Sequence, residues 1–225
     1  MSLLTELAAF DSATVQNAAI LVRGYVHADE DYTGPDLQQY VAIGGPVTVG
    51  YAVTSTWTPI SDPAASGVPT NYSDYAAYWD ALAAVGAPTI AVLQDVDAPA
   101  RRGAMIGDCM ATTMKAMGSV GAVVDGCARD IPGVTEAGIS LWATGRVPGH
   151  GPFTLRSINE PVTVARLTIR PGDILIGDAD GITRLSPEIA ADVLKACHEV
   201  RAKEDKVKQI FLTPGFTIES WQKSR

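Results

Sequence analysis

Apolar and polar residues follow one another along the chain in stretches that predict strands and helices. Residues 3–24 have apolar positions at helical spacing and are expected to be helical, whereas residues 27–40, rich in Asp, Gly and Pro, are expected to form a loop. Residues 47–54 alternate as a strand does. Gly44 and Gly45 ahead of this strand do not predict a phosphate loop, because no helix follows them.

The middle of the chain predicts a parallel crossover. A Pro-, Ser- and Thr-rich stretch at 55–73 precedes a helix at 75–85 and a short apolar run at 89–94 that is typical of a buried strand. A helix at 108–117 and a second buried strand at 122–124 follow. The order strand, helix, strand indicates a right-handed connection between two parallel strands.

The last third predicts strands at 161–169 and 174–176, and then a hairpin turn at 178–181. That turn shares two aspartates and a glycine with calcium loops, but it lacks the rest of their twelve-residue pattern. A Ser-Pro pair then opens a long helix over 187–211. The tail 212–225 is more apolar than a free terminus usually is, so we expect helix and tail to make oligomer contacts.

Length and composition predict one domain over residues 1–225, and the sequence features below predict that it is cytoplasmic. The chain is 47% hydrophobic and 19% charged, which suffices for an ordinary core. Its net charge of -8 argues against nucleic acid as a partner, and no apolar run is long enough to span a membrane. The beginning of the chain does not have the pattern of a signal peptide. Cys109, Cys127 and Cys197 are spaced for neither a disulfide framework nor a zinc site.

Chemically useful residues gather where a helix starts and where the next strand ends. Gly107 and Asp108 open the predicted helix, so the N–H groups of Cys109 and Met110 should be unpaired and should favour an anion. Arg129-Asp130 follows the next strand. Because both points lie at the carboxyl edge of a parallel unit, Asp108 should approach Arg129 and Asp130, where open α/β sheets bind ligands.

These residues also have a purely structural interpretation. An aspartate at a helix start is most often a cap, and an Arg-Asp dipeptide after a strand is most often a surface pair of little energetic consequence. Cys109 is not expected to be a nucleophile, because no histidine accompanies it in the pattern. His27, His150 and His198 show no metal-ligand spacing.

Several motifs in a fixed order identify a family resemblance. The stretch 107–118 is followed by Gly121 to Gly126 and Arg129-Asp130, with further motifs at 45–54 and 170–181. Over about residues 10 to 210, this combination resembles the RraA-like family, which includes the 4-hydroxy-4-methyl-2-oxoglutarate/4-carboxy-4-hydroxy-2-oxoadipate aldolases. The resemblance implies a single-domain α/β sandwich similar to swivelling phosphohistidine-type domains, with a mixed sheet, assembled as homotrimers or homohexamers with interfacial active sites.

The resemblance also implies roles for individual residues. Asp130 matches the carboxylate that binds a divalent cation, Mg or Mn, and Arg129 matches the arginine that holds pyruvate. Asp108 matches the residue that positions a metal-bound water, and the segment Gly107, Cys109 and Met110 matches the backbone that contacts the substrate. A glutamate from the neighbouring subunit's C-terminal helix completes such sites; the candidates are Glu204 and Glu199.

The implied reaction is cleavage of a 4-hydroxy-2-oxo acid to pyruvate, or decarboxylation of oxaloacetate. Both pass through a pyruvate enolate, whose charge a hard cation and a guanidinium stabilise. The alternative is a non-catalytic regulator that acts by binding a protein, as relatives that regulate ribonuclease activity do. Such regulators generally lack the aspartate after the arginine, so Arg129-Asp130 favours the enzyme.

Two features bear on the substrate. The aldolase pattern has an acidic residue three positions after Asp130, but this chain has Gly133 there, with Glu136 farther along. Arg101 and Arg102 precede Gly107 and either reach a distal carboxylate of the substrate or form a solvated pair. The aldol substrate is therefore left open.

Overall fold

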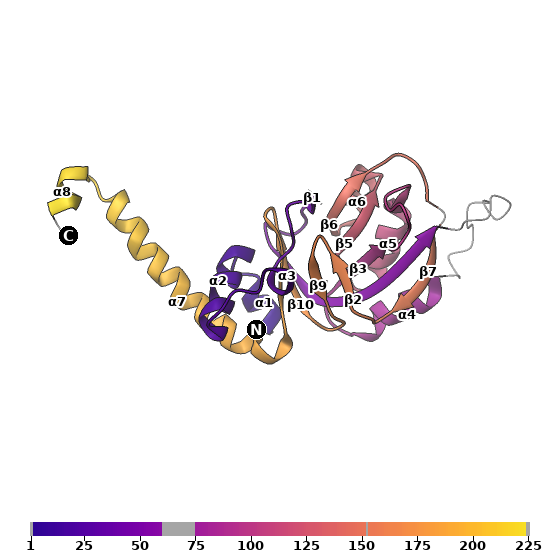
Figure 1. Ribbon diagram of the computed structural model, residues 1–225, viewed down its shortest axis with the longest axis horizontal. Helices are drawn as coiled ribbons and strands as arrows, with labels where there is room; N and C mark the ends of the chain where they lie inside the picture. The colour runs from indigo at the N-terminus through magenta and orange to yellow at the C-terminus, as the bar shows by residue number, and fades with distance from the viewer. Residues whose placement is uncertain (1, 60–74, 152, 224–225) are drawn as a thin grey trace.

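The computed structural model describes residues 2–59, 75–151 and 153–223, and it shows a curved mixed sheet with helices on its outer faces (Figure 1). Most of the stretch 55–73 lies outside these residues. The helices are α1 (Leu3–Leu7), α2 (Ser12–Arg23), α3 (Ala28–Asp31), α4 (Ala76–Ala84), α5 (Asp108–Ala116), α6 (Ile131–Ala137), α7 (Pro187–Leu212) and α8 (Ile218–Lys223). The strands are β1 (Gln38–Val41), β2 (Thr48–Pro59), β3 (Thr89–Asp95), β4 (Ala104–Ile106), β5 (Ser119–Ala128), β6 (Ser140–Arg146), β7 (Phe153–Ile158), β8 (Val162–Val164), β9 (Leu167–Ile169), β10 (Ile174–Asp178) and β11 (Gly181–Leu185).

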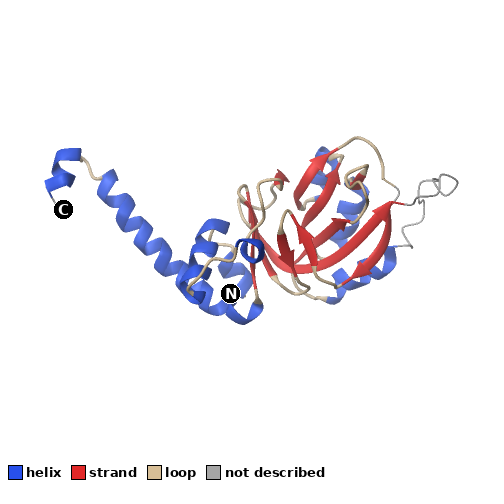
Figure 2. Ribbon diagram, viewed as in Figure 1, coloured by secondary structure: helices blue, strands red, loops and turns tan. Residues whose placement is uncertain are grey.

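The main sheet is parallel at its centre and antiparallel at its margins (Figure 2). Its order is β1-β6-β5-β3-β2-β10-β11, with β4 paired to β5 and β7 paired to β2. The pairs β2–β3, β3–β5 and β5–β6 are parallel, as the predicted crossover requires. The chain therefore has the mixed α/β fold expected from its sequence.

Alternation along each central strand divides the core between the two faces of the sheet. On β3, Ala91 and Leu93 pack with α4, α5 and α6, whereas Ile90 and Val92 pack toward the small β8–β9 sheet. On β5, Val123 likewise packs toward the β8–β9 sheet, whereas its neighbours Ala122 and Val124 pack with the helices. A third apolar cluster joins α1, α2 and α7 to the outer strands β10 and β11.

Helix boundaries follow the capping chemistry that the sequence predicts. Asp11 accepts a hydrogen bond from the Thr14 N–H at 2.7 Å, and Ser186 caps α7 with Pro187 at its first position. The predicted helix 3–24 is therefore two helices, because Asp11 begins a second one. The C-terminal part of α7, beyond its last buried residue Val200, extends away from the sheet in Figure 1, and α8 lies at its far end. Among the described helices, none is both long enough and apolar enough to cross a bilayer.

Several short elements differ from the sequence-based prediction. Residues 27–40, predicted as a loop, contain α3 and the start of β1. The strands β4 and β6 and the helix α6 were not predicted. β6 carries Trp142, which is fully buried and whose indole N–H donates to the Asp178 carbonyl at 2.8 Å. These elements are fixed by contacts with distant parts of the chain, which local propensity does not contain.

Gly177→Ala should lower the free energy of unfolding by about 1–3 kcal/mol, the usual cost of overpacking a core. A methyl group at Gly177 would lie 2.7 Å from a ring carbon of Trp142 and 2.6 Å from Ile182 Cδ1. Urea denaturation measures the change. Gly149→Ala is the control, because nothing lies within 4 Å of the added carbon there. Equal unfolding midpoints for the two variants would contradict this packing.

Candidate functional site

Pairing between β4 and β5 brings the two predicted halves of the site together. Ala104 pairs with Cys127 and Ile106 pairs with Ala128 in parallel register, and the Arg129 N–H donates to the Ile106 carbonyl at 3.0 Å. Gly107 follows β4 and Arg129 follows β5, so these two residues lie next to each other where the paired strands end. The site lies at the carboxyl edge of the parallel strands, as expected.

Arg129 and Asp130 form an ion pair that faces Gly107. Arg129 Nε lies 3.1 Å from Asp130 Oδ2, and the side chains are 31% and 43% exposed. Asp130 has φ 53° and ψ 41°, a left-handed conformation that aspartate tolerates better than most residues, and it precedes α6. A side chain at Gly107 would place its Cβ 2.7 Å from Asp130 Oδ2. Glycine at this position leaves the space that the carboxylate uses.

Asp108 sits beside the same glycine, at the first turn of α5. Its Oδ1 accepts a hydrogen bond from the Cys109 N–H at 2.6 Å. We predicted an unpaired Cys109 N–H, and this prediction is wrong. The neighbouring Asp108 carboxylate folds back onto the positive end of the helix and accepts its hydrogen bond. On its other side, Asp108 is packed against Gly133 of α6, where an added Cβ would lie 2.6 Å from Asp108 Cβ.

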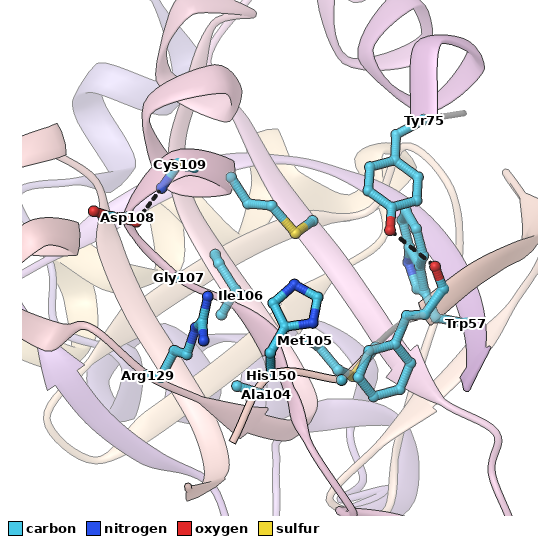
Figure 3. Close-up of a pocket in the computed structure, with 13 residues that line it drawn as sticks. Trp57, Tyr75, Ala104, Met105, Ile106, Gly107, Asp108, Cys109, Arg129 and His150 are labelled. Atoms are coloured by element: carbon cyan, nitrogen blue, oxygen red, sulfur yellow. Dashed lines mark hydrogen bonds between the residues drawn. The ribbon is translucent and has the colours of Figure 1, made fainter. Parts of the chain in front are cut away.

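A pocket of about 160 Å³ opens at these residues. Figure 3 shows Arg129, Asp108 and Gly107 at one side, with Trp57 and Tyr75 across from them and His150 between. Backbone and side chains of β4 form its floor. The complete lining is Trp57, Tyr75, Ala104, Met105, Ile106, Gly107, Asp108, Cys109, Met110, Arg129, His150, Gly151 and Phe153.

His150 is a pocket residue that sequence reasoning did not select. It follows β6 and is placed by a bridge to Ala104, because β4 runs beside this loop. Partial burial lowers the pKa of His150 below its ordinary value of 6.5, and the positive charge of Arg129 lowers it further. The imidazole is therefore neutral at pH 7. No signal in the sequence would have found it, because its neighbours in the pocket are remote in the chain.

Other candidates lie away from the pocket. Glu204 is on α7, 3.8 Å from Lys208 Nζ, and Glu199 is exposed on the same helix. Arg102 pairs with Asp97 in its own loop, with Nε and Oδ2 2.5 Å apart. Glu136 lies on α6 and does not line the pocket. Within one chain, the carboxylates available to a cation at this edge are those of Asp130 and Asp108; over the described ranges, no three acidic, His or Cys side chains converge.

The chain belongs to the RraA-like family. The family model described as RraA-like, Aldolase/RraA, matches residues 14–184. This range includes every pocket residue and ends within β11, before α7 begins.

Relatives of known sequence share part of the chain. A protein of Halalkalibacterium halodurans that carries the provisional name 4-hydroxy-4-methyl-2-oxoglutarate aldolase is 31% identical over 103 residues, 45% of this chain and 49% of that protein. An uncharacterised protein of Methanocaldococcus jannaschii is 28% identical over 110 residues, 48% of this chain and 53% of that protein. The alignments thus span about half the length of these relatives.

Two solved structures share the fold over nearly the whole chain. An uncharacterised protein from Pseudomonas syringae pv. tomato is 24% identical with a TM-score of 0.72, covering 99% of this chain and 93% of that one. RraAS2 of Streptomyces coelicolor, described as an unusual member of the RNase ES inhibitor RraA protein family, is 23% identical with a TM-score of 0.69, covering 92% and 95%. At these identities the likeness shows the fold alone.

The pKa of His150 should lie below 6.5 and should rise when Arg129 is replaced by Gln, because a nearby positive charge disfavours the imidazolium. The value should not return fully to 6.5, since burial is the larger cause. NMR titration of the imidazole protons measures both values. Lys195→Gln, which removes an exposed cation on α7, is the control and should leave the titration unchanged. An unaltered His150 pKa in Arg129→Gln would show that the two side chains do not interact.

Proposed function

We propose that this protein is a divalent-metal-dependent lyase that cleaves 4-hydroxy-2-oxo acids to pyruvate, decarboxylates oxaloacetate, or does both. The observation that carries the proposal is the grouping of Arg129, Asp130 and Asp108 around Gly107, next to a pocket that Arg129 and Asp108 line and Asp130 does not. Membership of a family whose model is described as Aldolase/RraA supports it.

The donor atoms at this edge suit a hard cation. Mg²⁺ and Mn²⁺ prefer carboxylate oxygens and water, and Mg²⁺ is commonly held by one or two carboxylates while keeping several waters. Asp130 has one oxygen near Arg129 and a second oxygen that this ion pair does not use, and its side chain is 43% exposed. Asp130 would hold the metal directly, and Asp108 would hold a water of its shell. The bound cation supplies Lewis-acid stabilisation of negative charge on the substrate oxygen.

The residues of the chain have distinct tasks in the reaction. Arg129 offers a planar set of donors that grips the carboxylate and the 2-oxo group of the pyruvate half. Its charge stabilises the enolate more than the ketone, which is the condition for lowering the barrier. The Met110 N–H at the start of α5 adds a donor to the same carboxylate. Asp108, on the opposite side of Gly107, orients the water that carries the proton to or from the substrate.

We further propose that a second subunit completes the site, in a homotrimer or homohexamer. In the described part of the chain, the far end of α7 and α8 exposes large apolar side chains, which mark protein interfaces when they gather on one surface. These are Val207, Ile210, Phe211, Leu212 and Ile218, with Leu212 74% exposed. The same helix carries Glu204 and Glu199, and Figure 1 shows its far end remote from α5, whose first turn lines the pocket of its own chain. A glutamate from this helix would therefore serve a neighbouring site, with Glu204 as the first candidate and Glu199 as the second.

The competing function is a regulator that acts by binding a protein, the role named for the Streptomyces coelicolor RraAS2 family. A regulator does not need the carboxylate of Asp130 beside Arg129 at a pocket. We therefore place the lyase first, and the test below separates the two.

Asp130→Ala should reduce Mg²⁺- or Mn²⁺-dependent pyruvate release from oxaloacetate by at least about 100-fold, since losing one charge-stabilising contact in a transition state typically costs about 3 kcal/mol. A coupled pyruvate assay, with and without chelator, measures the rate. Asp192→Ala removes an exposed carboxylate on α7 and is the matched control. Full activity in Asp130→Ala, or no pyruvate release by the unaltered protein from any 2-oxo acid tested, would overturn the lyase proposal.

Gly133→Ala should lower pyruvate release while leaving the protein folded. Alanine favours the helix more than glycine does, but the added Cβ would lie 2.6 Å from Asp108 Cβ, which the backbone holds in place, so the first turn of α5 must shift away from α6. Comparing kcat with the thermal unfolding midpoint separates these effects. Activity equal to that of the unaltered protein would show that the position of Asp108 is not needed.

A further inference from the structure

We infer that the lyase site accepts 4-hydroxy-2-oxo acids whose C4 substituent is small, uncharged and apolar, rather than substrates with a second carboxylate at that end. The inference rests on the proposed function, because it assigns the pyruvate half to Arg129 and asks what the remaining pocket can hold. It names the aldehyde half of the substrate, which leaves after the C3–C4 bond breaks.

The wall across from Arg129 is aromatic and apolar. Trp57 and Tyr75 meet edge to face with ring centroids 5.0 Å apart, and Met105 and Phe153 lie beside them. Figure 3 shows Trp57 and Tyr75 on the side of the pocket that faces Arg129 across His150. A substrate held by its carboxylate at Arg129 would therefore direct its other end toward these rings. Such surfaces are favourable for apolar groups and offer no compensation to an anion.

The polar atoms of these two rings are already engaged in hydrogen bonds within the protein. The Tyr75 hydroxyl donates to the Phe153 carbonyl at 2.8 Å, and the Trp57 indole N–H donates to Ser55 Oγ at 2.8 Å. Figure 3 shows the first of these bonds at the edge of the pocket. This wall therefore offers the carbon surfaces of the two rings to a substrate, because the Tyr75 hydroxyl and the Trp57 indole N–H bind protein atoms.

A second substrate carboxylate would find no cation among the described pocket residues other than Arg129. Arg102, which the sequence offered for that task, is paired with Asp97 outside the pocket, and Arg101 does not line it. The sequence of residues 60–74 contains no Lys or Arg. Asp108 adds a negative charge on the same side as Arg129. A carboxylate at C4 would thus be partly desolvated without a partner, which disfavours binding.

The size of the pocket limits the substituent. Its volume of about 160 Å³ is close to that of a protein cavity of about 150 Å³ that binds benzene. Because the pyruvate half also occupies this space, a small substituent at C4 fits it more readily than a large one.

His150 supplies the polar contact that such a substrate needs at C4. During cleavage the 4-hydroxyl loses its proton, the C3–C4 bond breaks, C4 becomes an aldehyde carbonyl, and the electron pair moves to C3 as the enolate. Protonation of C3 then gives pyruvate, so a short uncharged aldehyde is the second product. His150 lies between Arg129 and the aromatic wall in Figure 3, where an imidazole can hydrogen-bond an oxygen at C4.

A matched pair of substrates tests the inference. 4-Hydroxy-2-oxopentanoate and 4-hydroxy-2-oxoglutarate differ by a methyl group against a carboxylate at C4 and are similar in size. We expect kcat/KM to be on the order of 10–100-fold higher for the pentanoate, the discrimination that an unpaired charge produces. Oxaloacetate decarboxylation is measured in parallel, because it requires the enolate chemistry but no aldehyde pocket. Suppose that oxaloacetate is decarboxylated but kcat/KM for the glutarate equals or exceeds that for the pentanoate. This result would overturn the inference and leave the lyase proposal standing. Absence of pyruvate from all three substrates would overturn both.

Introducing a cation at position 150 should shift the preference toward the glutarate. His150→Arg places a guanidinium where the C4 substituent lies, and we expect it to raise the glutarate-to-pentanoate ratio of kcat/KM by about tenfold or more. His150→Gln changes the shape without adding charge and should keep the preference for the pentanoate. Asn17→Arg adds the same charge at an exposed position of α2 that does not line this pocket, and should leave the ratio unchanged. An unchanged ratio in His150→Arg would show that C4 lies elsewhere.

Discussion

The site depends on the close approach of two backbone segments at Gly107. The chain leaves β4 and β5 side by side, and the space that a side chain would take at Gly107 is filled by the Asp130 carboxylate. Gly133 makes the equivalent approach on the other side of Asp108. Two positions without Cβ atoms therefore allow the first turns of α5 and α6 to bring three charged side chains together.

This arrangement combines opposing electrostatic effects in a small volume. Of the two carboxylates, that of Asp130 lies 3.1 Å from the guanidinium of Arg129, whose positive charge offsets its negative charge. The start of α5 stabilises the other, through the Cys109 N–H that donates to Asp108 at 2.6 Å. The negative charge that remains is what a divalent cation would neutralise.

The sequence predicted the long, locally encoded elements well. The helix start at Ser186 and the buried strand at 89–94 were correct, because short-range hydrogen bonds and apolar runs determine them. β4 and β6 were missed, since strands of this kind form only when distant partners pair with them. The approach of Asp108 to Arg129 followed from parallel topology, whereas the packing of Gly133 on Asp108 did not.

The residues that line the pocket were harder still to predict from the sequence. Trp57, Phe153 and His150 come from three different strands or loops, and nothing in their spacing indicates that they share one cavity. Arg101 and Arg102 look like a binding pair in the sequence, but Arg102 is held by Asp97 in its own loop. Tertiary contacts decide which charged side chains reach a pocket, and a single sequence does not contain those contacts.

The left-handed backbone at Asp130 has a consequence for how this fold can change its task. Asparagine tolerates that conformation as well as aspartate does, whereas most other side chains are strained there. Exchange of one carboxylate oxygen for an amide nitrogen would thus remove the negative charge and leave the main chain undisturbed. In the proposed lyase, an Asp-to-Asn replacement at this one position would therefore remove the carboxylate that holds the cation and leave the fold intact.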